Sequence, residues 1–124
     1  MFELKIKNNF SAAHKLAMVG EKCENLHGHN WHIEVRVSGE NLNQAGVLVD
    51  FGSIKQFVNE IMEELDHKYL NEIEIFNDMQ PTSERIAVYI AKRLQKLLDR
   101  LDEKVRVSSV TAWESKDSSA TYFP

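Results

Sequence analysis

The tripeptide His27-Gly28-His29 carries the clearest chemical signal in the chain. In a β-strand, residues two positions apart point to the same side, so both imidazoles would project from one face. Gly28 between them has no side chain, so the backbone at this position can come close to a bound group. His14 has the parity of the apolar face of its own predicted strand, and a hairpin of the two strands would bring three imidazoles together. Three histidines leave a fourth zinc position for water or substrate, so the pattern predicts an open Zn²⁺ site at His14, His27 and His29.

Cys23 makes a second kind of zinc site an alternative. The spacing Cys-x-x-x-His-Gly-His is compatible with a closed structural site in which Cys23 is the fourth ligand. Closed sites more usually carry two or more cysteines, whereas this chain has one.

Asp66-His67 and Glu114 are the other candidates for chemistry. A carboxylate can fix the tautomer of a general acid–base histidine, provided that the helix carrying the pair ends there. The alternative is plain helix termination, because the helix dipole favours histidine near a C-terminus. Glu114 shares the strand parity of Val110 and Ala112. A carboxylate on an apolar face needs a partner, which could be an arginine or the N–H donors of a bound heterocycle.

Hydrophobic periodicity indicates the elements that must position these residues. Alternation with period 2 predicts strands, and apolar residues spaced by three and four predict amphipathic helices. The resulting order is ββααββ, an α+β fold with an antiparallel sheet and two helices on one face. The predicted strands cover residues 2–14, 27–39, 105–114 and 120–123, and the helical stripes run from Ile54 to Leu65 and from Ile86 to Leu101. Such a sheet has two free edges, which invite pairing with another copy and predict an oligomer.

Local signals mark where these elements begin, bend and end. Ser53 can cap the first helix, Asp50 just before it is a turn or cap residue, and Thr82 is the expected cap of the second helix. The parity of the third strand breaks near Ser108-Ser109, which predicts a β-bulge. We expect residues 71 to 81 to be irregular. Three large aromatic residues are expected in the core: Trp31, Phe51 and Trp113.

Length and composition limit the number of domains, the kinds of partner and the cellular setting that we expect. By length the 124 residues form one domain, spanning 1–124. A net charge of −4 and the lack of any run of Lys or Arg argue against nucleic acid as a partner. No stretch approaches the roughly 20 apolar residues of a membrane span, and because the N-terminus shows strand alternation we expect it to be a strand and not a signal peptide. A single cysteine cannot form an internal disulfide, so we expect a reducing, cytoplasmic setting.

Several of these motifs follow one another in a fixed order. They are Cys23-x-x-x-His27-Gly28-His29-Asn30, Val49-Asp50-Phe51, Leu65-Asp66-His67-x-x-Leu70-Asn71, Pro81-Thr82-Ser83-Glu84 and Glu114. The ordered set resembles the 6-pyruvoyl tetrahydropterin synthase family over nearly the whole chain. The resemblance implies the tunnelling fold, in which three subunits close a barrel and two barrels stack into a homohexamer. It implies 7,8-dihydroneopterin triphosphate as substrate. For short bacterial-type members it implies conversion to 6-carboxytetrahydropterin in the queuosine pathway, with release of acetaldehyde and triphosphate.

The resemblance also implies a role for each candidate residue. The three histidines would hold Zn²⁺, and Cys23 as a thiolate would be the base, because a nearby cation lowers the pKa of a thiol. His67, oriented by Asp66, would relay protons. Glu114 and Thr82 would bind the pterin, with Glu114 making a bidentate contact to its N–H edge. In the family the site lies between subunits, so Asp66 and His67 would serve a neighbour's zinc.

Glu24, which follows Cys23, leaves the product open. Some relatives use a glutamate in this segment and cleave the side chain to 6-hydroxymethyl-7,8-dihydropterin for folate, and 6-pyruvoyl tetrahydropterin is a third product. We predict Cys23 as the main base, because neighbouring residues on an extended segment point to opposite sides and only one can face the substrate well. A hypothesis of another class is a non-catalytic, zinc-stabilised assembly module. Such a module would not need Cys23, Asp66 and Glu114 beside an open metal site.

Overall fold

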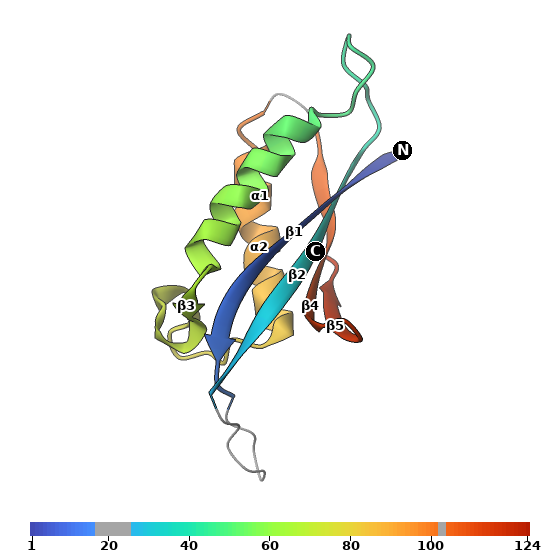
Figure 1. The fold of residues 1–124 in the computed structure, drawn as a ribbon. Helices are drawn as coiled ribbons and strands as arrows, with labels where there is room; N and C mark the ends of the chain where they lie inside the picture. Colours follow the sequence, from blue (N-terminus) through green and yellow to red (C-terminus); the bar gives the residue numbers. More distant parts are fainter. Residues whose placement is uncertain (17–25, 102–103) are drawn as a thin grey trace.

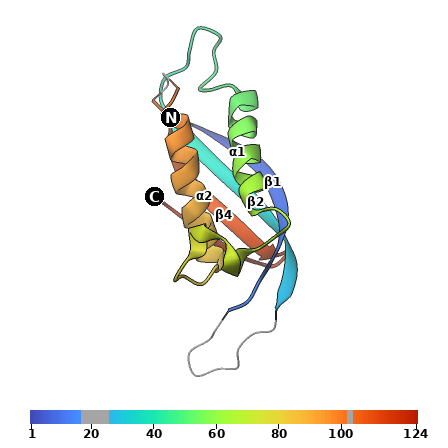
Figure 2. The same ribbon diagram turned by 90° about the vertical axis from the view of Figure 1, so that its left-hand side faces the viewer.

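The computed structural model describes residues 1–16, 26–101 and 104–124. Two α-helices cover one face of a five-stranded sheet, whose strand order is β3-β1-β2-β4-β5 (Figures 1 and 2). The elements are β1 (Phe2–His14), β2 (His27–Gly39), α1 (Phe51–Leu65), β3 (Lys68–Tyr69), the 3₁₀ turns η1 (Leu70–Glu72) and η2 (Glu74–Phe76), α2 (Ser83–Leu98), β4 (Arg106–Ser115) and β5 (Ser118–Tyr122). The expected α+β fold is confirmed.

The long hairpin of β1 and β2 forms the centre of the sheet. Its antiparallel register runs without a break from the pair Phe2–Gly39 to the pair His14–His27. Alternation turns one side of both strands toward the helices, and the apolar residues on that side are buried. The predicted strands 2–14 and 27–39 are therefore confirmed.

The core lies between this side of the sheet and the apolar stripes of α1 and α2. Trp31 is fully buried, as expected, whereas the side chain of Phe51 is 51% exposed and Trp113 is only partly buried on the opposite side of the sheet. The expectation that Phe51 and Trp113 belong to the core is thus wrong. The buried helical residues are Ile54, Val58, Ile61, Met62 and Leu65 in α1, and Ile86, Ala87, Ile90, Ala91, Leu94, Leu97 and Leu98 in α2.

The two helix caps differ in how well the sequence predicted them. Thr82 caps α2, because its side chain accepts a hydrogen bond from the Arg85 N–H at 3.2 Å. Of the two candidates at the start of α1, Ser53 as the cap is wrong, and Asp50 is confirmed. The N-cap residue is Asp50, without a side-chain cap bond, and Ser53 lies inside the first turn, where its N–H donates to the Asp50 carbonyl.

Two departures from a simple antiparallel sheet matter for the site. The two-residue strand β3 pairs in parallel with β1 at Ala12 and Ala13, an element that periodicity did not predict. The predicted bulge is present, because the register of β4 against β2 shifts between Val107 and Ser109. This extra residue switches the parity of β4, so that Val107 before the bulge and Val110, Ala112 and Glu114 after it share one side.

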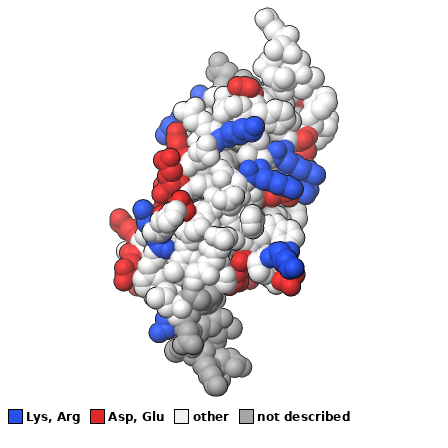
Figure 3. Space-filling model, viewed as in Figure 1, with Lys and Arg blue, Asp and Glu red and all other residues white. Residues whose placement is uncertain are grey.

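The surface carries charges of both signs. On the face seen in Figure 3, acidic and basic side chains are interspersed rather than gathered into one basic field. In the part of the chain that the structure describes, no helix is long and apolar enough to cross a membrane.

Candidate active site

Three potential metal ligands converge on the helix-facing side of the sheet. His14 ends β1, His29 lies near the start of β2, and Glu114 lies near the end of β4. Glu114 Oε1 is 2.8 Å from His29 Nε2 and 3.3 Å from His14 Nε2, and ligand atoms of all three residues lie within 4.8 Å of one another. The side chain of His14 is fully buried, whereas those of His29 and Glu114 are 21% and 32% exposed. The cluster is therefore anchored in the core and opens to solvent through His29 and Glu114.

Strand pairing explains how residues far apart in sequence meet. His29 lies opposite Ala12, two residues from His14 on β1, so the two histidines are diagonal neighbours on one face of the hairpin. The bulge in β4 brings Glu114 to the same face. These side chains are thus positioned by regular strands instead of loops, which holds their directions firmly.

The hydrogen bonds of His14 test whether this group suits a metal. His14 Nδ1 lies 3.0 Å from the Pro81 carbonyl oxygen. A carbonyl only accepts, so Nδ1 carries the proton, and in the neutral imidazole Nε2 presents a lone pair. That lone pair faces a carboxylate oxygen at 3.3 Å, an arrangement that calls for a positive charge between them. Metal-binding histidines characteristically donate their other N–H to a carbonyl, so the donor set fits a divalent cation such as Zn²⁺.

Trp31 forms the wall behind both imidazoles. Its ring meets His14 edge-on at a centroid distance of 5.2 Å and His29 edge-on at 5.5 Å. Trp31 in turn stacks on Phe10 at 6.0 Å. Because this aromatic group is buried, it restricts rotation of the imidazoles about their Cα–Cβ bonds.

Asp66 and His67 form a second polar group at the outer edge of β1. Asp66 Oδ2 lies 2.9 Å from His67 Nδ1, and Asp66 Oδ1 accepts the Ser11 N–H at 2.8 Å. The His67 N–H donates to the Ser11 carbonyl. The helix does end here, as pairing of these neighbours requires, and His67 adopts a left-handed φ of 56°. The His67 side chain is 83% exposed, so the pair presents an imidazole at the edge of the sheet.

The main-chain bond to Ser11 also sets the ionisation of this pair. The Ser11 N–H, and to a lesser degree His67, outweigh desolvation and hold the pKa of Asp66 below its ordinary value of 3.8. The carboxyl is therefore ionised at neutral pH and can orient the imidazole through its Nδ1–H.

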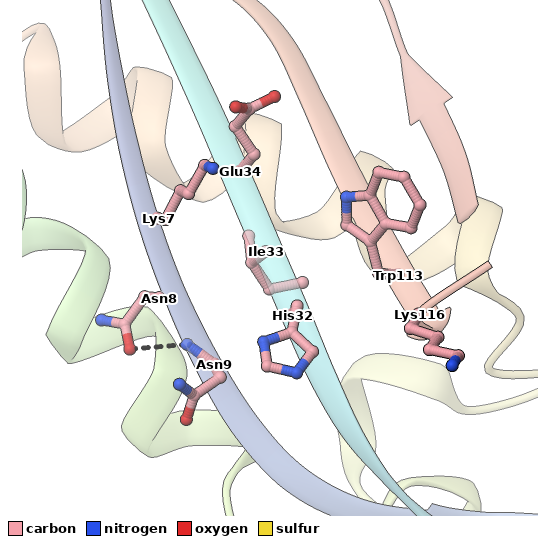
Figure 4. A pocket seen from close by; sticks show the side chains of 8 residues that line it. All are labelled: Lys7, Asn8, Asn9, His32, Ile33, Glu34, Trp113 and Lys116. Atoms are coloured by element: carbon pink, nitrogen blue, oxygen red, sulfur yellow. Dashed lines mark hydrogen bonds between the residues drawn. The ribbon is translucent and has the colours of Figure 1, made fainter. Parts of the chain in front are cut away.

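A pocket of about 410 Å³ lies on the other face of the sheet and does not include the cluster. Figure 4 shows Trp113 and Lys116 on one side of it and Asn9 on the other, with His32 between. Its lining residues are Lys7, Asn8, Asn9, His32, Ile33, Glu34, Trp113 and Lys116. His32 thus points away from the side of His29, as strand alternation requires. Because the potential metal ligands lie elsewhere, we place the candidate active site at the histidine cluster.

Comparison with known proteins identifies the family. The family model described as 6-pyruvoyl tetrahydropterin synthase matches residues 3–124. The chain belongs to this family. It is therefore an enzyme of the pterin synthase group, and the resemblance seen in its motifs is confirmed.

Individual relatives of this pterin synthase differ in the activity that they are named for. A Bacillus subtilis 6-carboxy-5,6,7,8-tetrahydropterin synthase is 32% identical over 128 residues, which cover 99% of this chain and 86% of the relative. A Pyrococcus furiosus dihydroneopterin monophosphate aldolase is 36% identical over 109 residues, covering 88% and 86%. The structure of 6-pyruvoyl tetrahydropterin synthase from Caenorhabditis elegans superposes with a TM-score of 0.84 at 24% identity, covering 99% of this chain and 95% of that one. The tunnelling fold is thus shown.

Not every predicted site residue of this pterin synthase can be placed. Cys23, Glu24 and the side chain of His27 lie outside the described residues, although the backbone of His27 pairs with His14. Thr82 directly follows Pro81, whose carbonyl accepts a hydrogen bond from His14 of the cluster. The Pro81 carbonyl was not predicted, since a main-chain atom leaves no mark in residue type.

Proposed function

We propose that this pterin synthase converts 7,8-dihydroneopterin triphosphate to 6-carboxy-5,6,7,8-tetrahydropterin in the cytoplasm, as a step toward queuosine. The conversion consumes one water and releases acetaldehyde and triphosphate. It balances as an internal redox reaction, because the ring gains two hydrogens while the side-chain carbon attached to it becomes a carboxylate. The observation that carries the proposal is that His14, His29 and Glu114 lie together in space in a chain that belongs to a family of pterin enzymes. The product is supported by the Bacillus subtilis relative, which aligns over 99% of this chain.

We propose His14, His27 and His29 as the ligands of a Zn²⁺ ion. Bound zinc would supply Lewis-acid chemistry, lowering the pKa of a side-chain hydroxyl and stabilising enolate-like charge. The pairing of His14 with His27 across the hairpin supports the three-histidine set. Glu114 is then left to accept hydrogen bonds from the pterin, which suits its partly exposed position at the mouth of the cluster.

The remaining residues are proposed to bind substrate and move protons. Cys23 removes a side-chain proton as a thiolate, and His67 relays protons while Asp66 holds its Nδ1–H. The Thr82 hydroxyl accepts from Arg85 and so retains its own proton to donate to a ligand. Glu114 accepts two parallel N–H bonds from the pterin edge.

A second candidate is aldol cleavage to 6-hydroxymethyl-7,8-dihydropterin. The Pyrococcus furiosus relative favours it, because that protein is named for an aldolase activity on dihydroneopterin monophosphate. Glu24, beside Cys23, is the residue that could serve this reaction. Cleavage between the first two side-chain carbons would leave the first carbon on the ring as a hydroxymethyl group and release the other two as glycolaldehyde that carries the phosphate.

Chromatography of the products separates these candidates. Wild type, Cys23→Ala and Glu24→Ala are each given dihydroneopterin triphosphate and, separately, the monophosphate. We expect 6-carboxytetrahydropterin from the triphosphate, a loss of about 10²–10⁴-fold in rate for Cys23→Ala, and a change within a few-fold for Glu24→Ala. Hydroxymethyldihydropterin as the main product, with activity lost in Glu24→Ala and kept in Cys23→Ala, would establish the second candidate instead.

Metal analysis of purified protein tests the ligand set independently of the reaction. One zinc per subunit is expected in wild type, with zinc lost in His29→Ala and His27→Ala. Full zinc content in His29→Ala would remove the proposed centre. A Zn–S contact near ~2.3 Å to Cys23 in a metal-bound structure would support the closed structural site.

We further propose that the working unit is a homo-oligomer, for which the family resemblance implies a hexamer of two trimers. The sheet ends in the short strands β3 and β5, and the exposed His67 adjoins the β3 edge, where a neighbouring subunit could use it. Light scattering at micromolar concentration tests this. A stable, active monomer would exclude both the shared site and the barrel.

A further inference from the structure

The segment after α1 fastens the outer edge of β1 at two points. At its start, Asp66 and His67 bond to the main chain of Ser11. At its end, the carboxamide of Asn71 bonds to the main chain of Lys15. Asn71 Oδ1 accepts the Lys15 N–H at 2.8 Å, and Asn71 Nδ2 donates to the Lys15 carbonyl at 2.6 Å. The short strand β3 lies between these two attachments.

The Asn71 carboxamide replaces a strand partner where the strands have already ended. β1 ends at His14 and β3 ends at Tyr69, yet Lys15 makes the donor and acceptor bonds that a neighbouring strand would provide. The carboxamide has one acceptor oxygen and a donor NH₂ side by side, which match the N–H and C=O of a single residue. Aspartate lacks the donor, and alanine lacks both groups.

This attachment acts directly on the histidine that precedes it. Holding both the N–H and the C=O of Lys15 fixes the peptide planes on either side of its Cα. The first of these planes begins at the Cα of His14, the atom that carries the side chain, so the clamp limits the main-chain rotation that aims the His14 side chain. The Pro81 carbonyl holds the other end of that side chain at Nδ1. His14 is therefore fixed both at its backbone and at its ring.

We propose that Asn71 is a positioning residue for the metal centre, which aims His14 by clamping the main chain of Lys15. The proposal rests on the proposed function, because it takes His14 as a metal ligand. It assigns a role to the last residue of the motif Leu65-Asp66-His67-x-x-Leu70-Asn71, for which the chemistry of the reaction has no direct use. Asn71 bonds the main chain of Lys15 and acts on His14 through that main chain.

Metal affinity is the quantity that the clamp should control. Changes to groups that orient metal ligands typically weaken metal binding by about 10- to 100-fold. We expect Asn71→Ala, which removes both bonds, to weaken Zn²⁺ binding by about 10-fold. Asn71→Asp keeps the size of the side chain but sets a carboxylate oxygen against the Lys15 carbonyl, so it should weaken binding as well.

Asn59→Ala is the matched control. It also removes an amide contact to β1, in this case from α1: the 2.6 Å bond from Asn8 Nδ2 to Asn59 Oδ1. Asn8 lies six residues before His14 on an extended strand, roughly 20 Å away at about 3.3 Å per residue. This variant should therefore bind zinc within two-fold of wild type.

The experiment measures Zn²⁺ affinity by competition with a chelating indicator and records the visible absorption of the Co²⁺-loaded protein. Thermal unfolding of the metal-free variants checks that they are folded, and Asn71→Asp decides the question if Asn71→Ala does not fold. Weaker zinc binding and an altered Co²⁺ spectrum in the Asn71 variants alone support the clamp. Wild-type affinity in the Asn71 variants, or equal weakening in Asn59→Ala, overturns it. A wild type that binds neither metal overturns the metal centre and the clamp together, whereas an unexpected pterin product bears only on the proposed reaction.

Discussion

Replacing Glu114 by glutamine distinguishes a pterin-binding carboxylate from a metal ligand. Glu114 Oε1 lies 2.8 Å from His29 Nε2 and 3.3 Å from His14 Nε2, so its position alone fits either role. Glutamine keeps the size of the side chain and one acceptor oxygen, but its NH₂ would face a pterin N–H. If Glu114 binds the pterin, the substitution removes at least one charge-assisted hydrogen bond from the complex and leaves zinc in place.

The size of the effect follows from the type of bond and its exposure. A hydrogen bond to a charged group contributes about 1.5–3 kcal/mol, which corresponds to about 10- to 150-fold in kcat/KM. The Glu114 side chain is 32% exposed, so water compensates part of the loss and the lower part of this range is expected. We therefore expect kcat/KM of Glu114→Gln to fall by about 10- to 50-fold, with zinc content unchanged.

The assay pairs initial rates with metal content on the same preparations. Glu34→Gln is the control, because it removes the same charge from a partly buried carboxylate that bonds Arg36 and lines the pocket on the opposite face. The control should keep both rate and zinc. If Glu114→Gln loses most of its zinc while His27→Ala keeps it, Glu114 is the third ligand and the reasoning above is refuted.

Three further changes test other parts of the structure. Asp66→Asn should lower kcat by about 10²-fold or more with zinc retained, because the amide no longer holds the imidazole as a carboxylate does; unchanged kcat would remove the dyad from the mechanism. Burial and the bond to Glu64 raise the pKa of Tyr89 to about 12, so the stability that Tyr89 contributes is complete below pH 10 and lost as pH rises toward 12. Ultraviolet titration should show a tyrosine ionisation step near pH 12, and Tyr89→Phe should abolish that step. Gly39→Ala would place a Cβ 2.6 Å from Leu48 Cδ1, so we expect a loss of about 1–3 kcal/mol in the free energy of unfolding, measured by denaturant titration.

The hairpin could be predicted from sequence because a strand repeats every two residues. Thirteen residues of alternation left one choice of face for His14 and His29, and the observed register agrees with it. The bulge could be predicted for the same reason, since a break in parity near Ser108 is visible in the sequence. Glu114 was therefore assigned to the correct face before its neighbours were known.

The features that were missed depend on main-chain atoms or on very short elements. β3 has two residues, too few to show a period, and its parallel pairing joins distant parts of the chain. The Pro81 carbonyl accepts from His14, and the Lys15 main chain bonds Asn71, so both contacts use main-chain groups that do not depend on residue type, apart from the N–H that proline lacks. Ser53 was a wrong candidate for the cap of α1, because exposed Phe51 does not belong to the apolar stripe that defined the helix.

The attachments of the 66–71 segment to β1 have a consequence for how this strand tolerates change. Each of them uses the main chain of Ser11 or Lys15, not the side chain of either residue. Substitutions at these two positions should therefore be nearly neutral for the site, and both positions could carry a spectroscopic label or an altered surface charge. Proline is the exception, because it removes the N–H that Asp66 or Asn71 accepts. A library built at positions 11 and 15 should thus tolerate most amino acids and exclude one.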